Sequence, residues 1–156
     1  MRAWNVQRWL TNKQKMNLQK VIFLEGLFSI KDVRHPGSMY QRPYERLIVW
    51  QEAHALFLWI NNVANTLPQH EKFALVDQMR RSAYSVPMNI AEGNGRRTKK
   101  DKRRFFNIAH SSLEELHSQV RTVRDLGYIS QEIFEKGCNW INRVSYLVMR
   151  LHQNCN

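Results

Sequence analysis

The sequence predicts an all-α fold, an antiparallel up-down four-helix bundle in residues 39–156. Apolar residues recur at helical spacing in four successive stretches, and short breaker segments separate these stretches. No stretch of useful length alternates apolar and polar residues as a half-buried β-strand would. The chain has six glycines and four prolines among 156 residues, which suits long helices. We therefore expect one helical domain, preceded by a separate arm.

The arm, residues 1–38, is basic and ends in a breaker cluster at residues 35–38. Three alternatives are open for it: a functional basic tail that need not be ordered, a transit-like segment, or a non-native extension. The last alternative would follow from the choice of start codon, because Met39 would make a self-sufficient start.

The first predicted helix covers residues 44–66 and stops before Pro68. Its middle, residues 56–60, is a continuous apolar run, so its apolar face is unusually wide. A helix that is apolar nearly all round must be buried on more than one side. In a chain of this size, the pattern indicates an interface between copies of the chain, and therefore a homo-oligomer.

The second predicted helix covers residues 71–92 and contains Pro87, which should kink it by removing one backbone donor. Asn89 is expected to satisfy backbone groups that the proline frees. Gly93 and Gly95 are expected to permit the left-handed turn that ends the helix. The predicted buried seam repeats at 3-4-3-4 spacing and consists of Val76, Met79, Ala83, Val86 and Ile90.

The third predicted helix begins at Thr98, a candidate N-cap with Asp101 three residues later, and ends before Gly127. The fourth predicted helix is capped by Ser130. The seam of the third helix is Ala109, Leu113, Leu116, Val120 and Val123. The seam of the fourth is Ile141, Val144, Val148, Leu151 and Cys155.

The net charge of +11 is concentrated in two places. Residues 1–38 hold seven Lys and Arg against two acids, and residues 39–156 hold seventeen against eleven. Within the second segment, residues 96–104 alone hold seven cations and one acid; we call them the cation run. A run this dense repels itself and opposes the dipole of the helix that it begins. An anionic partner would offset that cost, and nucleic-acid phosphate is the commonest candidate. The alternative is a charged face that contacts only solvent.

The candidate nucleic-acid contacts are the cation run and four arginines that neighbouring helices or subunits could align with it. They are Arg80, Arg81, Arg96, Arg97, Lys99, Lys100, Lys102, Arg103, Arg104, Arg121 and Arg124. Contacts would be mostly with phosphates, so binding should be sensitive to salt and tolerant of sequence. The sequence contains no known base-reading motif.

Four residues around the second helix end, Asn89, Glu92, Gly93 and Gly95, could form a functional site, but we interpret them as structural. Glu92, close to Arg96 and Arg97, is expected to form a charged clamp, within one chain or between subunits. The glycines supply backbone freedom. The predicted structural residues are Pro87, Asn89, Glu92, Gly93 and Gly95.

Other functions find little support in the sequence. His110 and His117 lie seven residues apart, and with Glu114 and Glu115 they make an ordinary polar helix face. Without an HExxH motif, a paired CxxC motif or a Gly-rich phosphate loop, we predict no metal, no cofactor and no catalytic residue. Cys138 and Cys155 are too far apart in one helix to pair, which suggests reduced thiols in the cytoplasm. No run of about 18 uncharged apolar residues predicts a membrane span.

Residues 81–93, RSAYSVPMNIAEG, resemble the "SIPxNIAEG" signature of the bacterial four helix bundle proteins, also called 23S ribosomal RNA intervening-sequence proteins. Gly95 and Arg96 continue the match. Further blocks of similarity are YERLIVWQ at residues 44–51, FFNIA at 105–109, SLEEL at 112–116 and LGYI at 126–129. The resemblance covers about residues 40–155. The chain departs from the family at Ser111, where glycine is usual, and in the more basic start of the third helix.

The resemblance implies a small bundle that assembles into a ring-like homopentamer. Relatives of this family include accessory proteins of diversity-generating retroelements, which form basic pentameric barrels that bind nucleic acid and a reverse transcriptase. We therefore expect a noncatalytic accessory or scaffold protein whose partners are further copies of itself, RNA or DNA, and a reverse transcriptase. The alternative is a protein–protein adaptor whose basic face docks an acidic partner such as a reverse transcriptase.

Overall fold

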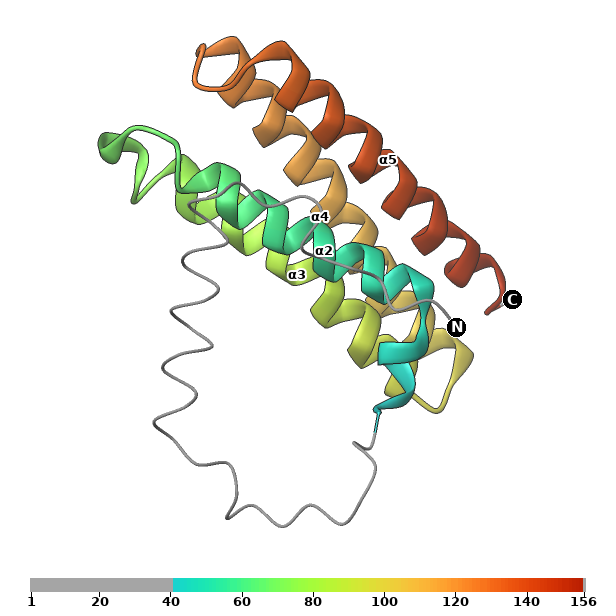
Figure 1. Ribbon diagram of the computed structural model, residues 1–156. Coiled ribbons are helices and arrows are strands. Elements are labelled where there is room, and N and C mark those ends of the chain that lie inside the picture. Colours follow the sequence, from blue (N-terminus) through green and yellow to red (C-terminus); the bar gives the residue numbers. More distant parts are fainter. Residues whose placement is uncertain (1–40, 156) are drawn as a thin grey trace, which may run out of the picture. The chain divides into compact units, whose positions relative to one another are not determined.

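The computed structural model describes residues 41–155 and shows four long helices with no strand in that range (Figure 1). The prediction of an all-α fold is therefore confirmed for the described residues. The helices are α2 (Ile48–Ala64), α3 (Leu75–Gly95), α4 (Lys99–Asp125) and α5 (Gln131–Gln153), with short 3₁₀ helices η3 (Pro43–Arg46) and η4 (Gln69–Glu71). The predicted arm, residues 1–38, lies outside the described residues.

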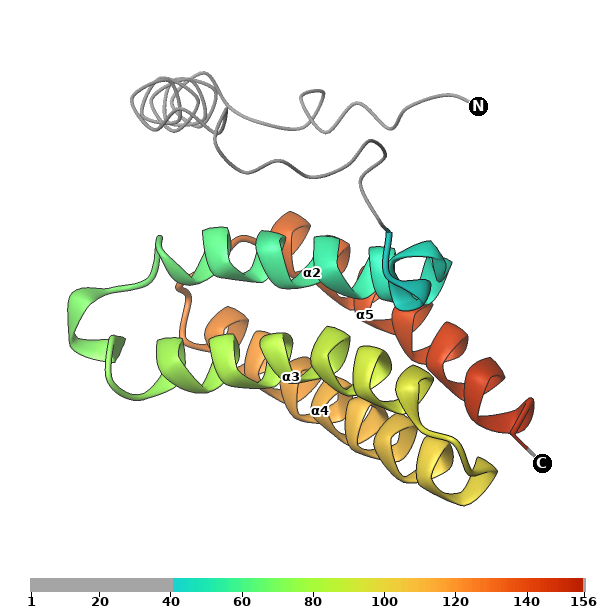
Figure 2. The same ribbon diagram turned by 90° about the horizontal axis from the view of Figure 1, so that it is seen from below.

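Successive helices alternate in direction, and each packs against the helix before it (Figures 1 and 2). One end of this bundle carries the start of α2, the turn between α3 and α4, and the end of α5. The other end carries the α2–α3 and α4–α5 connections. This arrangement decides which residues can form one site, because each end gathers segments that are distant in sequence.

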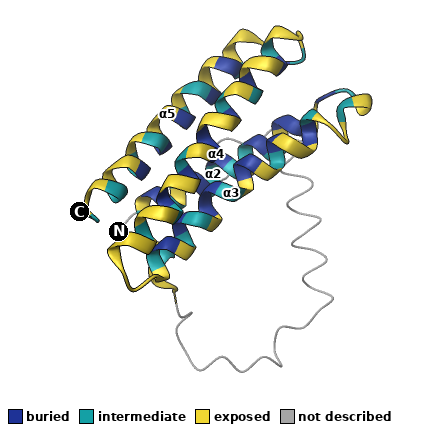
Figure 3. Cartoon of the chain, turned by 180° about the vertical axis from the view of Figure 1, so that it is seen from behind, coloured by how far each residue is buried: buried dark blue, intermediate teal, exposed yellow. Residues whose placement is uncertain are grey.

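The core lies along the predicted seams (Figure 3). All five predicted seam residues of α3 and all five of α4 are at most 4% exposed. Of the seam predicted for the fourth helix, the first three residues are buried, whereas Leu151 and Cys155 are only half-buried, and Cys155 lies two residues beyond the end of α5. The bundle thus packs less tightly around the last turns of α5.

The first predicted helix starts later than expected. Pro43 begins η3, and then Leu47 takes an extended conformation with ψ of 122° before α2 starts at Ile48. The N–H group of Arg42 donates to Glu45 Oε2 at 3.0 Å, which holds the short turn separately from α2. This local hydrogen bond stabilises a short turn in place of a continuous helix. The apolar pattern continues through the turn, so the pattern alone could not reveal the break at Leu47.

The wide apolar run of α2 is largely covered within the chain itself. Leu56 and Ile60 are at most 1% exposed. Phe57 packs edge-on against Tyr84 of α3, with ring centres 5.6 Å apart. On the other side, Trp59 lies against Trp140 of α5, with ring centres 6.1 Å apart. Contacts with both α3 and α5 therefore account for most of the width, and Leu58, 46% exposed, is the outward-facing member of the run.

Helix α3 begins after η4, later than the predicted residue 71. The prediction that Gly93 and Gly95 permit a left-handed turn at its end is wrong. Gly93 and Gly95 both lie inside α3, and among the described glycines only Gly127 has a positive φ, 75°. The helix instead ends because Arg96 becomes extended, with its N–H group donating to the Gly93 carbonyl at 3.2 Å. Gly93 serves close packing, because an added Cβ would lie 2.7 Å from Phe106 Cε1. An added Cβ at Gly95 would meet nothing within 4 Å.

Helix α3 continues through Pro87 to Gly95. The missing N–H group of Pro87 leaves the Ala83 carbonyl without its helical donor. Asn89 does not supply that donor, because its Nδ2 donates to the Ser85 carbonyl at 2.8 Å and to Ser85 Oγ at 3.0 Å. The expected role of Asn89 is therefore corrected: it braces Ser85, which accepts a hydrogen bond from Ser112 of α4 at 2.9 Å.

The predicted starts of α4 and α5 are confirmed. Thr98 Oγ1 accepts the N–H group of Asp101 at 3.1 Å and donates to Asp101 Oδ2 at 2.7 Å. Ser130 Oγ accepts the N–H group of Ile133 at 3.3 Å. Between these helices, Gly127 takes the left-handed conformation that ends α4.

Candidate nucleic-acid interface

The cation run forms the turn between α3 and α4 and the first turns of α4. Six of its seven cations are exposed, and Lys102 is half-exposed (Figure 3). Arg96 and Arg97 directly follow the C-terminal end of α3, where the negative end of that helix dipole favours cations. The position of Arg96 and Arg97 at the end of α3 therefore offsets part of the unfavourable electrostatic energy that we expected for the cation run. The remaining five cations lie in α4, where its own dipole opposes them.

Arg96 is held by its own chain. Its guanidinium pairs with Glu92 one turn earlier and lies over the ring of Phe105, 4.5 Å from the ring centre. The clamp predicted for Glu92 thus forms within one chain. By contrast, Arg97, Lys100, Lys102, Arg103 and Arg104 have no acidic side chain within 4.0 Å among the described residues. Their charge is available to a mobile or bound anion.

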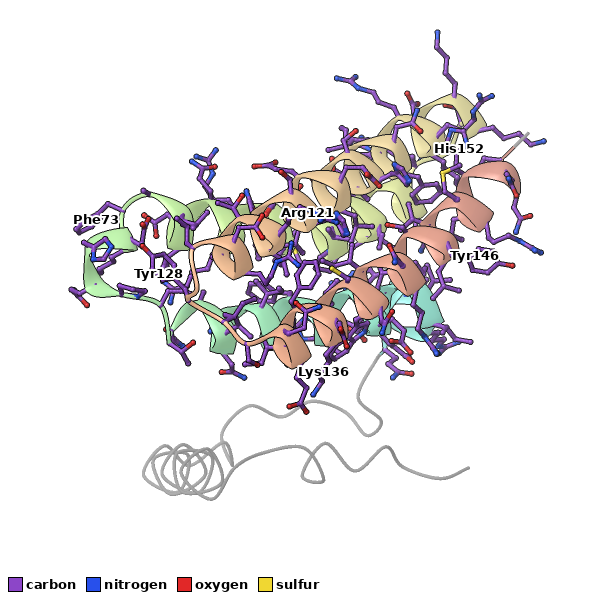
Figure 4. The ribbon with its side chains drawn as sticks, turned by 90° about the horizontal axis from the view of Figure 1, so that it is seen from above. Phe73, Arg121, Tyr128, Lys136, Tyr146 and His152 are labelled. Carbon is purple, nitrogen blue, oxygen red and sulfur yellow. The ribbon has the colours of Figure 1, made fainter. Side chains whose placement is uncertain are left out.

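The four additional arginines lie elsewhere. Arg121 is 17 residues beyond Arg104 on the same helix, which corresponds to about 26 Å at 1.5 Å per residue. Figure 4 shows Arg121 well separated from His152 at the end of α5. Arg124 follows at the same far end. Arg80 and Arg81 lie level with this part of α4, because the adjacent Ser82 hydroxyl donates to Gln119 at 2.6 Å. One chain therefore separates the candidates into the cation run and a group of four distant arginines.

Three of these four arginines have partners within the bundle. Arg80 Nη2 donates to Asn65 Oδ1 at 2.6 Å and so links α3 to the end of α2. Arg121 and Arg124 lie over the ring of Phe134, 5.6 and 4.3 Å from its centre, and Arg124 Nε is 2.7 Å from Asp125 Oδ1. These contacts give the distant arginines a packing role. Arg81 is exposed.

A shallow groove of about 1180 Å³ continues from the cation run along α4. The end of α5 contributes to it, and the turn that carries His152 lies beside the first turns of α4 (Figure 4). The groove is lined by Lys99, Lys100, Arg103, Arg104, Asn107, Ile108, Ser111, Ser112, Glu115 and Cys155. Asn107 and Ile108 of this groove were not predicted as contacts, and Ser111 was noted only as a departure from the family. The available signal was the recurrence of short or polar residues at helical spacing after Arg104.

Cys138 of α5, close to Arg121 and Arg124 of α4, is not a reactive thiol. Partial burial raises the pKa of Cys138, and Arg121 and Arg124 counter only part of that effect. The thiol is therefore protonated at neutral pH, unlike the thiolate of a nucleophilic cysteine. No cluster of three or more residues suited to hold a metal ion occurs in residues 41–155. None of the helices in this range is both long and apolar enough to cross a membrane.

Comparisons with known proteins show the family and support the fold. Residues 45–150 match the family model described as 23S rRNA-intervening sequence protein. The crystal structure of a protein of unknown function from the S23 ribosomal protein family of Bacteroides thetaiotaomicron VPI-5482 is similar, with a TM-score of 0.64 and 22% sequence identity. That match covers 67% of this chain and 98% of the other, and at this identity it supports the fold alone. No curated protein matches the chain.

Proposed function

The chain belongs to the 23S rRNA-intervening sequence protein family, and we propose that it is a noncatalytic accessory or scaffold protein that binds RNA or DNA. In this proposal the cation run contacts the phosphate backbone, and the protein acts in the cytoplasm as a homopentamer. A reverse transcriptase is a further proposed partner, by analogy with the retroelement accessory proteins that the sequence resembles.

The observation that carries this proposal is the concentration of one sign of charge at one exposed turn. Seven cations lie within nine residues, and five of them have no acidic partner among the described residues. Their mutual repulsion would be relieved by a polyanion that releases its own counterions on binding. Seven contacts to a single strand correspond to a slope of at most about −5 per protomer in a plot of log affinity against log salt.

The proposed pentamer draws support from apolar side chains that remain exposed on a single chain. Ile48, Tyr84 and Tyr146 are 65%, 52% and 60% exposed. Burial of such side chains between copies would stabilise an assembly through the hydrophobic effect. A ring of five copies would also present the cation run five times, so weak phosphate contacts would combine into firm binding.

The rival function is an adaptor that docks an acidic protein. The side chain of Ile108, 40% exposed beside Arg104 in the groove, favours it, since protein interfaces combine apolar and charged contacts. Steep salt dependence with RNA would support the nucleic-acid function. Binding to a protein partner with no affinity for nucleic acid would support the adaptor.

The test combines light scattering after size exclusion with RNA titrations at low and high salt. Arg103→Glu with Arg104→Glu should abolish RNA binding and leave the oligomer intact. The matched control is Lys72→Glu with Lys136→Glu, which changes the net charge equally at the other end of the bundle and should weaken binding only slightly. RNA binding that survives in the first variant would show that the cation run is not the interface. A monomeric protein would overturn the proposed pentamer.

A further inference from the structure

The groove beside the cation run changes character along its length. Its first part carries Lys99, Lys100, Arg103 and Arg104, whereas the next turns of α4 present Asn107, Ile108 and Ser111. Glu115 closes the far end. From Lys99 to Glu115 the helix rises about 24 Å, so a stacked strand with one phosphate per about 3.4 Å would place at most about seven nucleotides along it.

The carboxylate of Glu115 is held in position. The Ser82 hydroxyl donates to Gln119 Oε1 at 2.6 Å, and Gln119 Nε2 donates to Glu115 Oε1 at 3.0 Å. Glu115 Oε2 has no hydrogen-bond partner among the described residues, and the residue is exposed. The side chain thus presents one carboxylate oxygen to the groove as an acceptor. Carboxylates of this kind accept hydrogen bonds from the N4 amino group of cytosine.

The neutral and acidic part of the groove does not suit a double helix. A duplex that lies along α4 would hold its phosphates against Asn107, Ile108 and Ser111, none of which is a cation, and would bring them towards Glu115. The like charge of Glu115 would then oppose binding. An unpaired strand can instead turn its bases into this part, where Ile108 offers an apolar surface and Glu115 offers an acceptor, while its phosphates stay on the cations.

We infer that the groove binds single-stranded nucleic acid and that Glu115 selects cytosine over uracil or thymine. This inference rests on the proposed function and names the ligand of the same site. Cytosine presents an amino donor where uracil and thymine present a carbonyl oxygen, which the Glu115 carboxylate repels. The phosphate contacts supply most of the affinity, and the base contact supplies the preference.

The test measures fluorescence anisotropy of oligocytidylate, oligouridylate and a mixed-sequence duplex, each of about ten nucleotides, at low salt. The wild-type protein should bind either single strand more tightly than the duplex and should prefer cytidine by about tenfold or more, as one hydrogen bond to a charged group would give. Glu115→Gln should bring the cytidine-to-uridine ratio close to one, because an amide offers a donor as well as an acceptor. Its overall affinity should rise slightly, since one negative charge is lost near phosphate.

The matched control is Glu114→Gln, which removes the same charge from the adjacent residue. Glu114 points towards His110, 3.9 Å away, and does not line the groove. This variant should keep the wild-type ratio of cytidine to uridine binding. Equal binding of duplex and single strand, or a ratio that Glu115→Gln leaves unchanged, would overturn the inference while the proposed function stands. Failure to bind any of the three oligonucleotides would overturn both.

Discussion

Replacing Gly93 by alanine tests how the turn that carries the cation run is built. Gly93 lies in the last turn of α3, against the first turns of α4. An added Cβ would lie 2.7 Å from Phe106 Cε1 and 3.0 Å from Phe105 Cβ. Phe106 is only 3% exposed, so its ring has no open space into which it could move. The two helices must therefore separate slightly to admit the methyl group.

The expected magnitude is the balance of two effects. Overpacking a well-filled site costs about 1–3 kcal/mol. Alanine recovers about 1 kcal/mol because glycine is the poorer helix former. Gly93→Ala should therefore destabilise the protein by about 1 kcal/mol. Gly95→Ala is the matched control, because its added Cβ meets nothing within 4 Å. That variant should stabilise the protein by about 0.4–1 kcal/mol.

Urea unfolding followed by circular dichroism measures both variants against the wild type. Protomer concentration must be equal in all samples, because assembly would contribute to the apparent stability. A Gly93→Ala protein as stable as Gly95→Ala would refute the packing argument, and would mean that both glycines act only through backbone freedom.

Three further predictions concern contacts elsewhere in the bundle. Thr98→Ala should lower the free energy of unfolding by about 1 kcal/mol in urea titrations, because α4 loses its N-cap. Trp140→Phe should cost about 1 kcal/mol in the same assay, because the indole no longer donates to Glu52 at 3.0 Å. Partial burial, and then the hydrogen bond to Glu71, raise the pKa of Tyr128 above 10.0. This tyrosine therefore loses its proton at a lower pH in the unfolded chain than in the folded one, so the free energy of unfolding should fall as the pH rises above about 10. Tyr128→Phe should remove the contribution of this tyrosine to the fall, which urea unfolding across this pH range would measure.

The spacing of apolar residues predicted the helices well, because the side chains that a helix buries must recur about once per turn. A residue such as Leu113 or Val120 must face the core at every turn, so the seams of α3 and α4 follow from spacing alone. The break at Leu47 could not be predicted in this way, since a short hydrogen-bonded turn interrupts a pattern that remains helical. The role of Gly93 was missed for a related reason: no local pattern shows that a ring from another helix occupies the space beside it.

The candidate site was predicted in part. The cation run is contiguous in sequence, so its charge density needed no tertiary information. Within one chain, helix length places Arg121 about 26 Å from Arg104, so the predicted grouping of Arg121 with the run stays a prediction about neighbouring subunits. The groove depends on Cys155, just beyond the end of α5, and on the hydrogen bonds from Ser82 to Gln119 and from Gln119 to Glu115. Such contacts arise only from folding, so sequence patterns could not show them.

At the α3–α4 turn, some of the charged side chains contribute to the fold and others do not. Arg96 pairs with Glu92 and stacks on Phe105, and the Thr98 cap begins α4 without help from any cation. Arg103 and Arg104 make no comparable contact among the described residues, and each lies one helical turn after another cation, Lys99 and Lys100 respectively, so that like charges repel along the helix. Their contribution to the stability of an isolated chain is therefore unfavourable. Residues that weaken the fold where they stand are better explained by a bound anion than by folding, and this argument favours a ligand at the groove rather than a solvated surface.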